Sequence, residues 1–293
     1  MRVDPTAPPS SPAPARLILL GTAGGPRPNR YRASPAQVLL IDGEAHVIDC
    51  GYGVARQLVL AGVPLTALRC VYLTHHHSDH NADFGTLVWL AWASGLRAPV
   101  TVFGPPPLAE MRELFLRLHA YDIAVRTADE GRVPFAPLFQ VREVAAPGVV
   151  LETARLRVTI ERVHHPPVEP ALAYRFDTPE RAVVISGDTT YCPALVALAR
   201  DADLLVHEAM YVPALERLVG RVGNARRQLE HLLASHTPAA DAGRVAAEAG
   251  ARTLVLSHLV PCDDPTLSDT MWLEEAQRHY DGQVVIGRDL LAL

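Results

Sequence analysis

The stretch Thr74-His75-His76-His77-Ser78-Asp79-His80 places four imidazoles and one carboxylate within seven residues. It follows the apolar run 70–73, which predicts a buried strand, and it precedes residues 81–94, whose apolar spacing predicts a helix that stops at Gly95. Neutral imidazole and carboxylate groups are ligands that suit zinc and related metals. The stretch therefore predicts a metal-binding loop between strand and helix, rather than a polar loop with incidental histidines.

The order of the side chains within this loop indicates more than one metal ion. In an extended segment His75 and His77 point to the same side, because alternate residues share a side. Asp79 and His80 follow the turn and can reach a second point. We therefore predict a site for two metals.

The composition of the chain is that of a globular protein. Its 293 residues, 49% of them apolar, suffice for one large α/β domain, which we place at residues 16–293. Residues 1–15 are rich in Pro, Ala and Ser, and we expect them to form a disordered tail. The net charge of −5 provides no overall attraction for nucleic acid.

The cysteines and the hydropathy limit the cellular setting. Four widely spaced cysteines form no CxxC pair, so we expect neither a cysteine zinc site nor a disulfide framework. No apolar run reaches membrane length, so no membrane association is expected. A cytoplasmic location is expected, with a signal peptide removed before residue 1 as the alternative.

The apolar patterns alternate between strands and helices along the chain. They predict strands at 16–20, 37–41, 45–48, 70–73, 99–103, 156–163, 174–176, 182–186, 204–206, 253–257 and 284–286. They predict helices at 53–61, 81–94, 108–120, 193–200, 214–234 and 238–249. Residues 121–150 are expected to be less regular, with short strand-like runs such as 139–141. Thr237 is a favourable N-cap and Pro238 a favourable first residue, so His236 is expected at a helix N-terminus.

Polar side chains repeatedly follow the predicted strands. These strand-end residues are His75, His165, Asp188, His207, Glu208 and His258. Metals and substrates bind at the carboxyl ends of strands in α/β sheets, so we expect these side chains to converge. Asp49 also follows a strand, and it is either a hydrogen-bond acceptor for a metal-binding histidine or a turn cap.

The sequence THHHSDH resembles the HxHxDH signature of the metallo-β-lactamase superfamily. The segments HPPVEPALAYRF (165–176), SGDT (186–189), HEA (207–209), SHT (235–237) and LSH (256–258) resemble the motifs of its ribonuclease Z and arylsulfatase-like branch. The resemblance covers about residues 16–293. It implies an α/β fold of four layers, an αβ/βα sandwich with two mixed β-sheets flanked by helices.

The resemblance also implies a ligand set for two zinc ions, with manganese or iron as alternatives. The first ion would be held by His75, His77 and His165, the second by Asp79, His80 and His258, and Asp188 would bridge them. His165 is preferred to His164 because it directly precedes the Pro-Pro pair, and His76 matches no ligand position.

The implied activity is hydrolysis of esters by a metal-activated hydroxide. Asp79 would orient the hydroxide, and His236 would protonate the leaving group. A helix N-terminus disfavours imidazolium, so a carboxylate from Glu208 is needed to favour the protonated form. The alternative is that Glu208 is an ordinary surface side chain. The apolar residues 204–206 that precede it are expected to be buried, which favours the first interpretation.

The resemblance leaves the substrate open. Ribonuclease Z enzymes grip tRNA with a long arm between the third histidine and the bridging aspartate, and only 23 positions separate His165 from Asp188. We therefore expect a small anionic ester, an aryl sulfate or phosphodiester, and no nucleic acid. The alternatives are a ribonuclease Z-like tRNA 3′ endonuclease, a lactonase or β-lactamase, an iron-dependent oxidoreductase, and a metal-binding protein without activity. The oligomeric state is also open, with a homodimer as one alternative.

Overall fold

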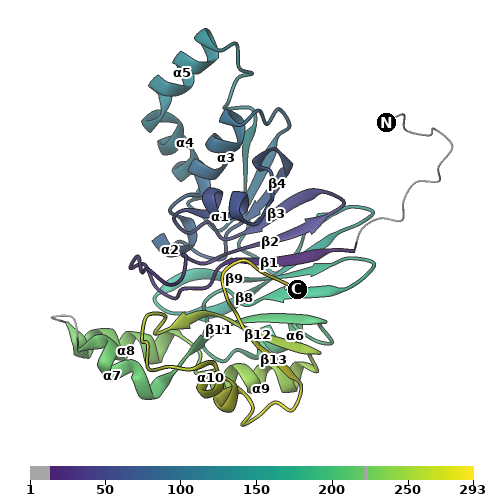
Figure 1. Ribbon diagram of the computed structural model, residues 1–293. Coiled ribbons are helices and arrows are strands. Elements are labelled where there is room, and N and C mark those ends of the chain that lie inside the picture. The colour runs from purple at the N-terminus through teal and green to yellow at the C-terminus, as the bar shows by residue number, and fades with distance from the viewer. Residues whose placement is uncertain (1–13, 221–223) are drawn as a thin grey trace.

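The chain folds into four layers, with two facing sheets between two sets of helices (Figure 1). The computed structural model describes residues 14–220 and 224–293. The fold that the sequence resemblance implied is thus confirmed. Of the expected tail, all but Pro14 and Ala15 lies outside the described residues.

The first sheet contains strands from both ends of the chain. In spatial order it comprises β14 (Leu291–Ala292), β1 (Arg16–Gly21), β2 (Ala36–Ile41), β3 (Glu44–Ile48), β4 (Leu68–Tyr72), β5 (Val100–Gly104) and β6 (Phe139–Glu143). The strands β3 to β6 run parallel, whereas β14, β1, β2 and β3 pair antiparallel. Its outer face packs against α1 (Val54–Leu60), α3 (Phe84–Ala93) and α4 (Leu108–Leu118).

The second sheet is built from the later part of the chain. In spatial order it comprises β13 (Gln283–Ile286), β12 (Thr253–Val260), β11 (Leu204–Met210), β10 (Ala182–Ile185), β9 (Val168–Asp177), β8 (Arg157–His165) and β7 (Gly148–Glu152). It is also mixed, because β10 to β13 pair parallel and β7 to β10 pair antiparallel. Its outer face packs against α6 (Pro193–Leu198), α9 (Ala239–Ala249) and α10 (Asp269–Ala276).

Aromatic side chains fill the space between the two sheets. The ring of Tyr72 on β4 lies 5.1 Å from Phe176 and 5.5 Å from Tyr174, both on β9, with edge-to-face geometry. Burying an apolar side chain of this size stabilises a fold by about 1.5–3 kcal/mol. This packing holds the ends of strands from both sheets next to one another.

The segment 121–150 is more regular than the sequence indicated. It contains α5 (Ala120–Asp129), which projects with α4 from the body of the molecule (Figure 1), and the strands β6 and β7. None of its side chains is fully buried, although Ile123 packs partly buried against the core of the first sheet. Arg126 also pairs with Asp122 and Glu130 at i,i+4 spacing, which supports the helix.

Several element boundaries differ from the expected ones. The helix expected at 81–94 is two helices, α2 (Ser78–Asn81) and α3. The helix expected at 214–234 is replaced by η2 (Val212–Ala214), α7 (Leu215–Val219) and α8 (Ala225–Ser235), and residues 221–223 lie outside the described part. The short helix η1 (Leu65–Ala67), α10 and β14 were not expected. Among the described residues, no helix has the length and apolar character needed to cross a bilayer.

Candidate metal centre

Strand ends and loops from both sheets converge at one edge of the sandwich. The side chains brought together there are His75, His77, Asp79, His80, His165, Asp188, Glu208, His236 and His258. His75 and His77 lie on the loop after β4, and Asp79 and His80 lie on the short helix α2 that follows it. The structure thus gathers at one point every side chain that the sequence analysis singled out as a ligand or catalytic group.

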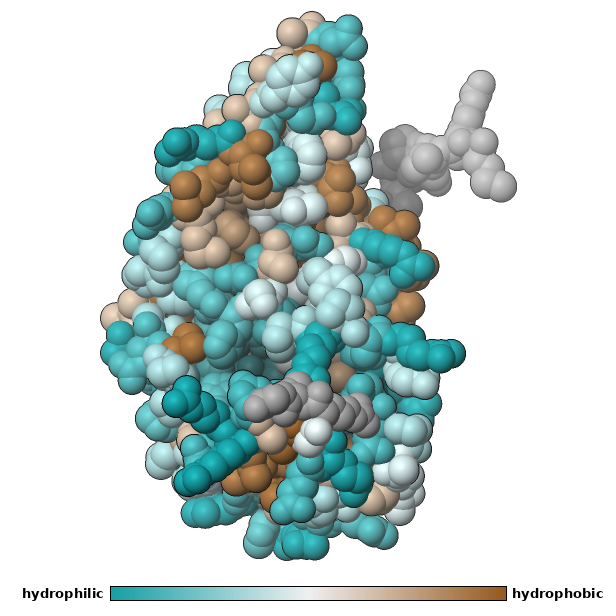
Figure 2. All heavy atoms as spheres, turned by 90° about the vertical axis from the view of Figure 1, so that its left-hand side faces the viewer, coloured by the Kyte–Doolittle hydropathy of each residue, from teal (hydrophilic) through white to brown (hydrophobic). Residues whose placement is uncertain are grey.

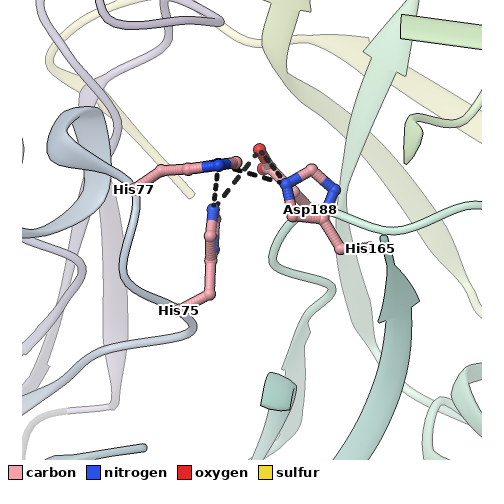
Figure 3. A group of neighbouring side chains, drawn as sticks. All are labelled: His75, His77, His165 and Asp188. Carbon is pink, nitrogen blue, oxygen red and sulfur yellow. Dashed lines mark hydrogen bonds and ion pairs between the residues drawn. The ribbon is translucent and has the colours of Figure 1, made fainter. Parts of the chain in front are cut away.

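One group consists of three histidines around a carboxylate (Figure 3). The Nε2 of His75 lies 3.0 Å from Nδ1 of His77, and the Nε2 of His165 lies 3.2 Å from the same atom. The Oδ2 of Asp188 lies 3.8 Å from His75 and 3.9 Å from His165. Ring nitrogens converging from separate segments on one carboxylate oxygen outline a pocket for a single ion.

A second group lies on the other side of the same carboxylate. Asp79, His80 and His258 form it, with Asp79 Oδ2 at 3.6 Å from His80 Nε2 and 3.4 Å from His258 Nε2. Asp188 reaches both histidines, since Oδ1 lies 3.3 Å from His80 Nε2 and Oδ2 lies 3.3 Å from His258 Nε2. Asp188 therefore stands between the two groups.

The backbone before Asp188 explains how its side chain reaches this point. Gly187 has φ +60°, and a Cβ there would lie 2.7 Å from the Leu172 carbonyl oxygen and 2.9 Å from the Thr74 side chain. Only glycine fits such a left-handed turn at so close an approach. This turn follows β10 directly and aims Asp188 into the site.

A bulge in β12 aims His258 into the site. The pairing of β11 with β12 shifts between Glu208 and Ala209, which leaves His258 as the extra residue on its strand. His258 also has φ +47°, an uncommon conformation for a residue with a side chain. Bulges of this kind re-aim a side chain next to active sites. His207, Glu208 and His258 therefore lie within their strands, and not at the strand ends where we expected them. His207 was expected to converge with the others, but it is not among the ligand groups found in the described residues, and its Nδ1 lies 2.7 Å from the Glu208 carbonyl oxygen.

Neighbouring groups fix the orientation of the inner histidines. The Nδ1 of His80 lies 2.8 Å from Asp49 Oδ2, and the other oxygen of Asp49 accepts a hydrogen bond from the Thr74 backbone N–H at 2.8 Å. The Nδ1 of His165 lies 2.7 Å from the carbonyl oxygen of Ser235. Such contacts leave the remaining nitrogen of each ring facing the site. Of the two alternatives for Asp49, the structure shows the contact with a histidine.

The two remaining histidines of these motifs point elsewhere. His76 lies with Nε2 2.7 Å from the Pro105 carbonyl oxygen, and its Nδ1 accepts a hydrogen bond from Asn81. His164 is exposed, whereas the neighbouring His165 is buried within the cluster. The preference for His165 over His164 therefore agrees with the geometry.

The contact between Asp49 and His80 leads to a testable prediction. Asp49→Asn is expected to weaken zinc binding by about 10- to 100-fold, because the amide cannot supply the charge that orients and polarises His80. Competition with a fluorescent zinc chelator measures this affinity. Asp42→Asn, in the turn between β2 and β3, is the matched control, and an equal loss in both variants would contradict the role of Asp49.

Buried charge determines the protonation of the cluster. Burial lowers the pKa of His165 to about 4 and that of His75 well below its usual value, so both rings are neutral. Burial opposes charge on His80 and His258 too, but Asp188 and other nearby carboxylates outweigh it and raise the pKa of both rings. The carboxylates of the cluster thus favour a positive charge in the space between them.

His236 and Glu208 form a separate pair beside the cluster. The Nδ1 of His236 lies 2.8 Å from Glu208 Oε2, and Glu208 Oε1 accepts a 2.6 Å hydrogen bond from the Thr189 N–H. Burial lowers the pKa of His236, but Glu208 outweighs it and raises the value to about 9. Glu208 is 2% exposed, so the alternative of an ordinary surface glutamate is wrong.

The position of His236 differs from the expectation in one respect. The residue before α9 is Pro238, without a side-chain cap, and the Thr237 hydroxyl donates to the Thr189 carbonyl instead. His236 is the residue that ends α8. A helix C-terminus favours a positive charge, so the helix nearest to His236 supports an imidazolium and does not oppose it.

The arginines of the helix expected at 214–234 were predicted to form a solvated face, with an anion site as the alternative, and their position above the cluster was not predicted. The cavity above the cluster, of about 620 Å³, is lined by Arg27 and Asn29 from the loop after β1 and by Arg227 and His231 from α8. Arginine and asparagine residues in loops and on a helix form no periodic pattern from which their place at a cavity could be predicted. Only their position in the fold brings them to the site.

A family model described as a beta-lactamase superfamily domain matches residues 46–259 of the chain. The chain belongs to the metallo-β-lactamase superfamily, in its ribonuclease Z-like branch. Proteins named Ribonuclease Z from Mycobacterium bovis (strain BCG / Pasteur 1173P2) and Mycolicibacterium gilvum (strain PYR-GCK) are 31% and 32% identical over 277 residues. These matches cover 94% of this chain and 96% and 94% of the two relatives.

Solved structures of the metallo-β-lactamase superfamily share the fold. The metallo-beta-lactamase fold protein YhfI from Bacillus subtilis superimposes with a TM-score of 0.72 at 22% identity and covers 97% of this chain and 99% of that one. The short form of human tRNase Z gives a TM-score of 0.69 at 20% identity, with 95% and 98% coverage. As a member of this superfamily, the protein is a metal-dependent hydrolase, and the histidine–aspartate cluster is consistent with a site for two metals.

Proposed function

We propose that this chain is a ribonuclease Z-like phosphodiesterase that cleaves RNA on the 3′ side of a tRNA-like substrate. The observation that carries the proposal is identity of 31% over almost the full length of proteins named Ribonuclease Z, combined with the buried cluster. In this proposal the first metal would be held by His75, His77 and His165, the second by Asp79, His80 and His258, and Asp188 would be a ligand of both.

The donor atoms of the cluster fit two cations. Within the described residues His80 Nε2 and Asp188 Oδ1 are buried, 3.3 Å apart, and have no hydrogen-bond partner. The donor atoms of each group lie within 4.8 Å of one another. Imidazole nitrogen and carboxylate oxygen are ligands that zinc prefers, with manganese and iron as alternatives.

The chain's own groups then have separate tasks in hydrolysis. Bound zinc would supply Lewis-acid activation of water and stabilise negative charge on the phosphate. Asp79, whose pKa burial raises but His80 and His258 lower to about 2, is ionised and accepts a hydrogen bond from the attacking water. His236 donates a proton from Nε2 to the leaving oxygen, while Glu208 holds the proton on Nδ1 and stabilises the imidazolium.

The relatives weaken the expectation of a small ester in preference to RNA. Their alignments span 277 residues and cover 94–96% of their own length, so these relatives are about as long as this chain. The short sequence separation between His165 and Asp188, 23 positions, therefore does not distinguish this chain from proteins named Ribonuclease Z. Aryl sulfates and small phosphodiesters become the second candidate.

Precursor tRNA cleavage tests the proposed function. The zinc-loaded protein is expected to cut a precursor tRNA with a 3′ trailer at one position, and a metal chelator is expected to abolish the cut. Mapping the product end by primer extension or sequencing measures this. Hydrolysis of bis(p-nitrophenyl) phosphate without cleavage of any RNA would instead favour a small-ester substrate.

A further inference from the structure

Residues 74–77 form the loop after β4, which we call the metal loop, and His76 is the one of its three histidines whose ring faces away from the cluster. The rings on either side of it face the cluster, because alternate residues of an extended segment point to opposite sides. The Nε2 of His76 donates to the carbonyl oxygen of Pro105 at 2.7 Å, and its Nδ1 accepts from Asn81 Nδ2 at 3.1 Å. Both nitrogens of this ring are therefore engaged by groups outside the ligand set.

The two partners of His76 belong to two other elements of the fold. Pro105 lies in the turn between β5 and α4, and its carbonyl oxygen also accepts from the first N–H of α4 at 3.3 Å. Asn81 ends α2, the helix of four residues that carries Asp79 and His80. His76 thus ties the metal loop to the β5–α4 turn on one side and to α2 on the other.

Polar contacts hold this part of the site in place. α2 lies at the left of Figure 1, the side that Figure 2 faces, where hydrophilic residues predominate around the middle of the surface. None of the residues 74–83, all of which the structure describes, belongs to an apolar cluster of the core, and His76, His77 and Asn81 are half-buried. A helix of four residues is unstable by itself, so its position and that of the metal loop depend on contacts such as those of His76.

The ring of His77 lacks the outer support that the other histidines of the first group have. The Nδ1 of His75 lies 3.0 Å from the Thr74 hydroxyl, and that of His165 lies 2.7 Å from a backbone carbonyl oxygen at the end of α8. In the part of the chain that the structure describes, the hydrogen-bond partners of the His77 ring are His75 and His165 alone. The direction of the His77 ring therefore follows the backbone of the metal loop, which the adjacent His76 anchors with two hydrogen bonds.

We propose that His76 is a positioning residue, which holds the metal loop so that the ring of His77 faces the first ion. The proposal rests on the proposed function in one respect, the assignment of His77 as a ligand of that ion. It adds that the affinity for the first ion depends on a side chain that does not contact the ion. The second ion depends less on His76, because His80 has its own support from Asp49 at 2.8 Å.

Zinc affinities of the reconstituted apoprotein test this role. His76→Leu removes both hydrogen bonds and is expected to weaken one of the two zinc-binding steps by about 10- to 100-fold, as the loss of a group that orients a metal ligand does. The other step is expected to change little. His76→Gln is expected to recover much of the affinity, because its amide supplies both a donor and an acceptor. Competition with a series of zinc chelators measures both steps.

A double variant shows whether His76 acts through His77. His77→Ala is expected to weaken the same binding step as His76→Leu does. The double variant is expected to bind zinc no more weakly than His77→Ala alone, because a residue that acts through another has no separate effect once that residue is removed. A general structural role of His76 would instead add a further loss.

His164→Leu is the matched control. His164 is exposed and directly precedes the proposed ligand His165, as His76 directly precedes His77. The control is expected to keep both zinc affinities of the parent. Equal losses in His164→Leu and His76→Leu would contradict the positioning role. If His76→Leu does not fold, as judged by circular dichroism, Asn81→Ala replaces it, with a smaller loss in the same step because it removes one of the two hydrogen bonds.

Two results would overturn the proposal directly, namely unchanged zinc affinities in His76→Leu or additive losses in the double variant. Full zinc affinity in His77→Ala would also overturn it, since His77 would then be no ligand. Zinc binding is measured without RNA, so a failure of the proposed function is distinguishable. A parent protein that binds two zinc ions but cuts no RNA would contradict the proposed function and leave the role of His76 intact.

Discussion

Asp188→Ala is expected to bind at least one zinc ion fewer per chain than the parent and to lose hydrolytic activity. Its carboxylate lies within reach of both histidine clusters, at 3.3 Å from His80 and His258 and 3.8 Å from His75. Its removal takes one ligand away from each of the two ions. The loss of activity should be larger than about 10- to 100-fold, which is the loss expected when only a hydrogen-bond partner of a metal ligand is removed.

Metal analysis of the dialysed protein, with activity on the same sample, measures this effect. Asp177→Ala is the matched control, because Asp177 ends β9 on the same sheet and pairs only with Arg175 at the surface. It should retain full metal content. An Asp188→Ala protein with full metal content and unchanged activity would refute the bridging role.

His236→Ala is expected to retain both metals yet lose about a hundred- to ten-thousandfold in rate for esters with poor leaving groups. The ring is paired with Glu208 and lies 3.9 Å from Asp188 through Nδ1, and with Glu208, Asp188 and His258 it forms a group whose donor atoms lie within 4.8 Å of one another. We expect it to act as an acid and not as a ligand, because Glu208 already engages Nδ1. The loss should shrink for activated leaving groups such as nitrophenolate, which depart without a proton. A series of leaving groups at fixed metal content measures the difference.

Glu208→Gln is expected to weaken the same step less than His236→Ala does. The amide keeps the shape of the side chain but removes the charge that raises the pKa of His236. The double variant should be little slower than His236→Ala alone, because residues that act as one unit are non-additive. His279→Ala, an exposed histidine after α10, is the control. Equal slowing of good and poor leaving groups, or loss of metal, would show that His236 is a ligand or a substrate-binding residue.

The chemistry of the site could be predicted from the sequence because its groups lie in short, local patterns. The motif around His75 and Asp79 sits between a strand and a helix, and both flanks have clear apolar periods. The four-layer fold was implied by the resemblance of these motifs to the metallo-β-lactamase superfamily, and the alternation of predicted strands and helices agrees with it. Asp49 could be placed near a histidine, although the sequence could not choose between a turn cap and that contact.

Element boundaries were harder to predict where tertiary contacts replace local patterns. The helix α5 was not expected, and it contacts the core only through partly buried side chains such as Ile123. His258 lies in a bulge, and a bulge depends on the pairing of β11 with β12 and not on its own sequence. The N-cap expected at Thr237 was wrong because its hydroxyl donates to Thr189, which comes from another part of the chain.

The sequence by itself determined the kind of chemistry, because ligand type and spacing are properties of neighbouring residues. Only the tertiary structure decided which groups meet. It set the distances between Asp188 and the two histidine groups, paired Glu208 with His236, and brought Arg27 and Arg227 into the lining of one cavity. These contacts join residues far apart in the chain, and their distances depend on the packing of two sheets, which no local pattern encodes.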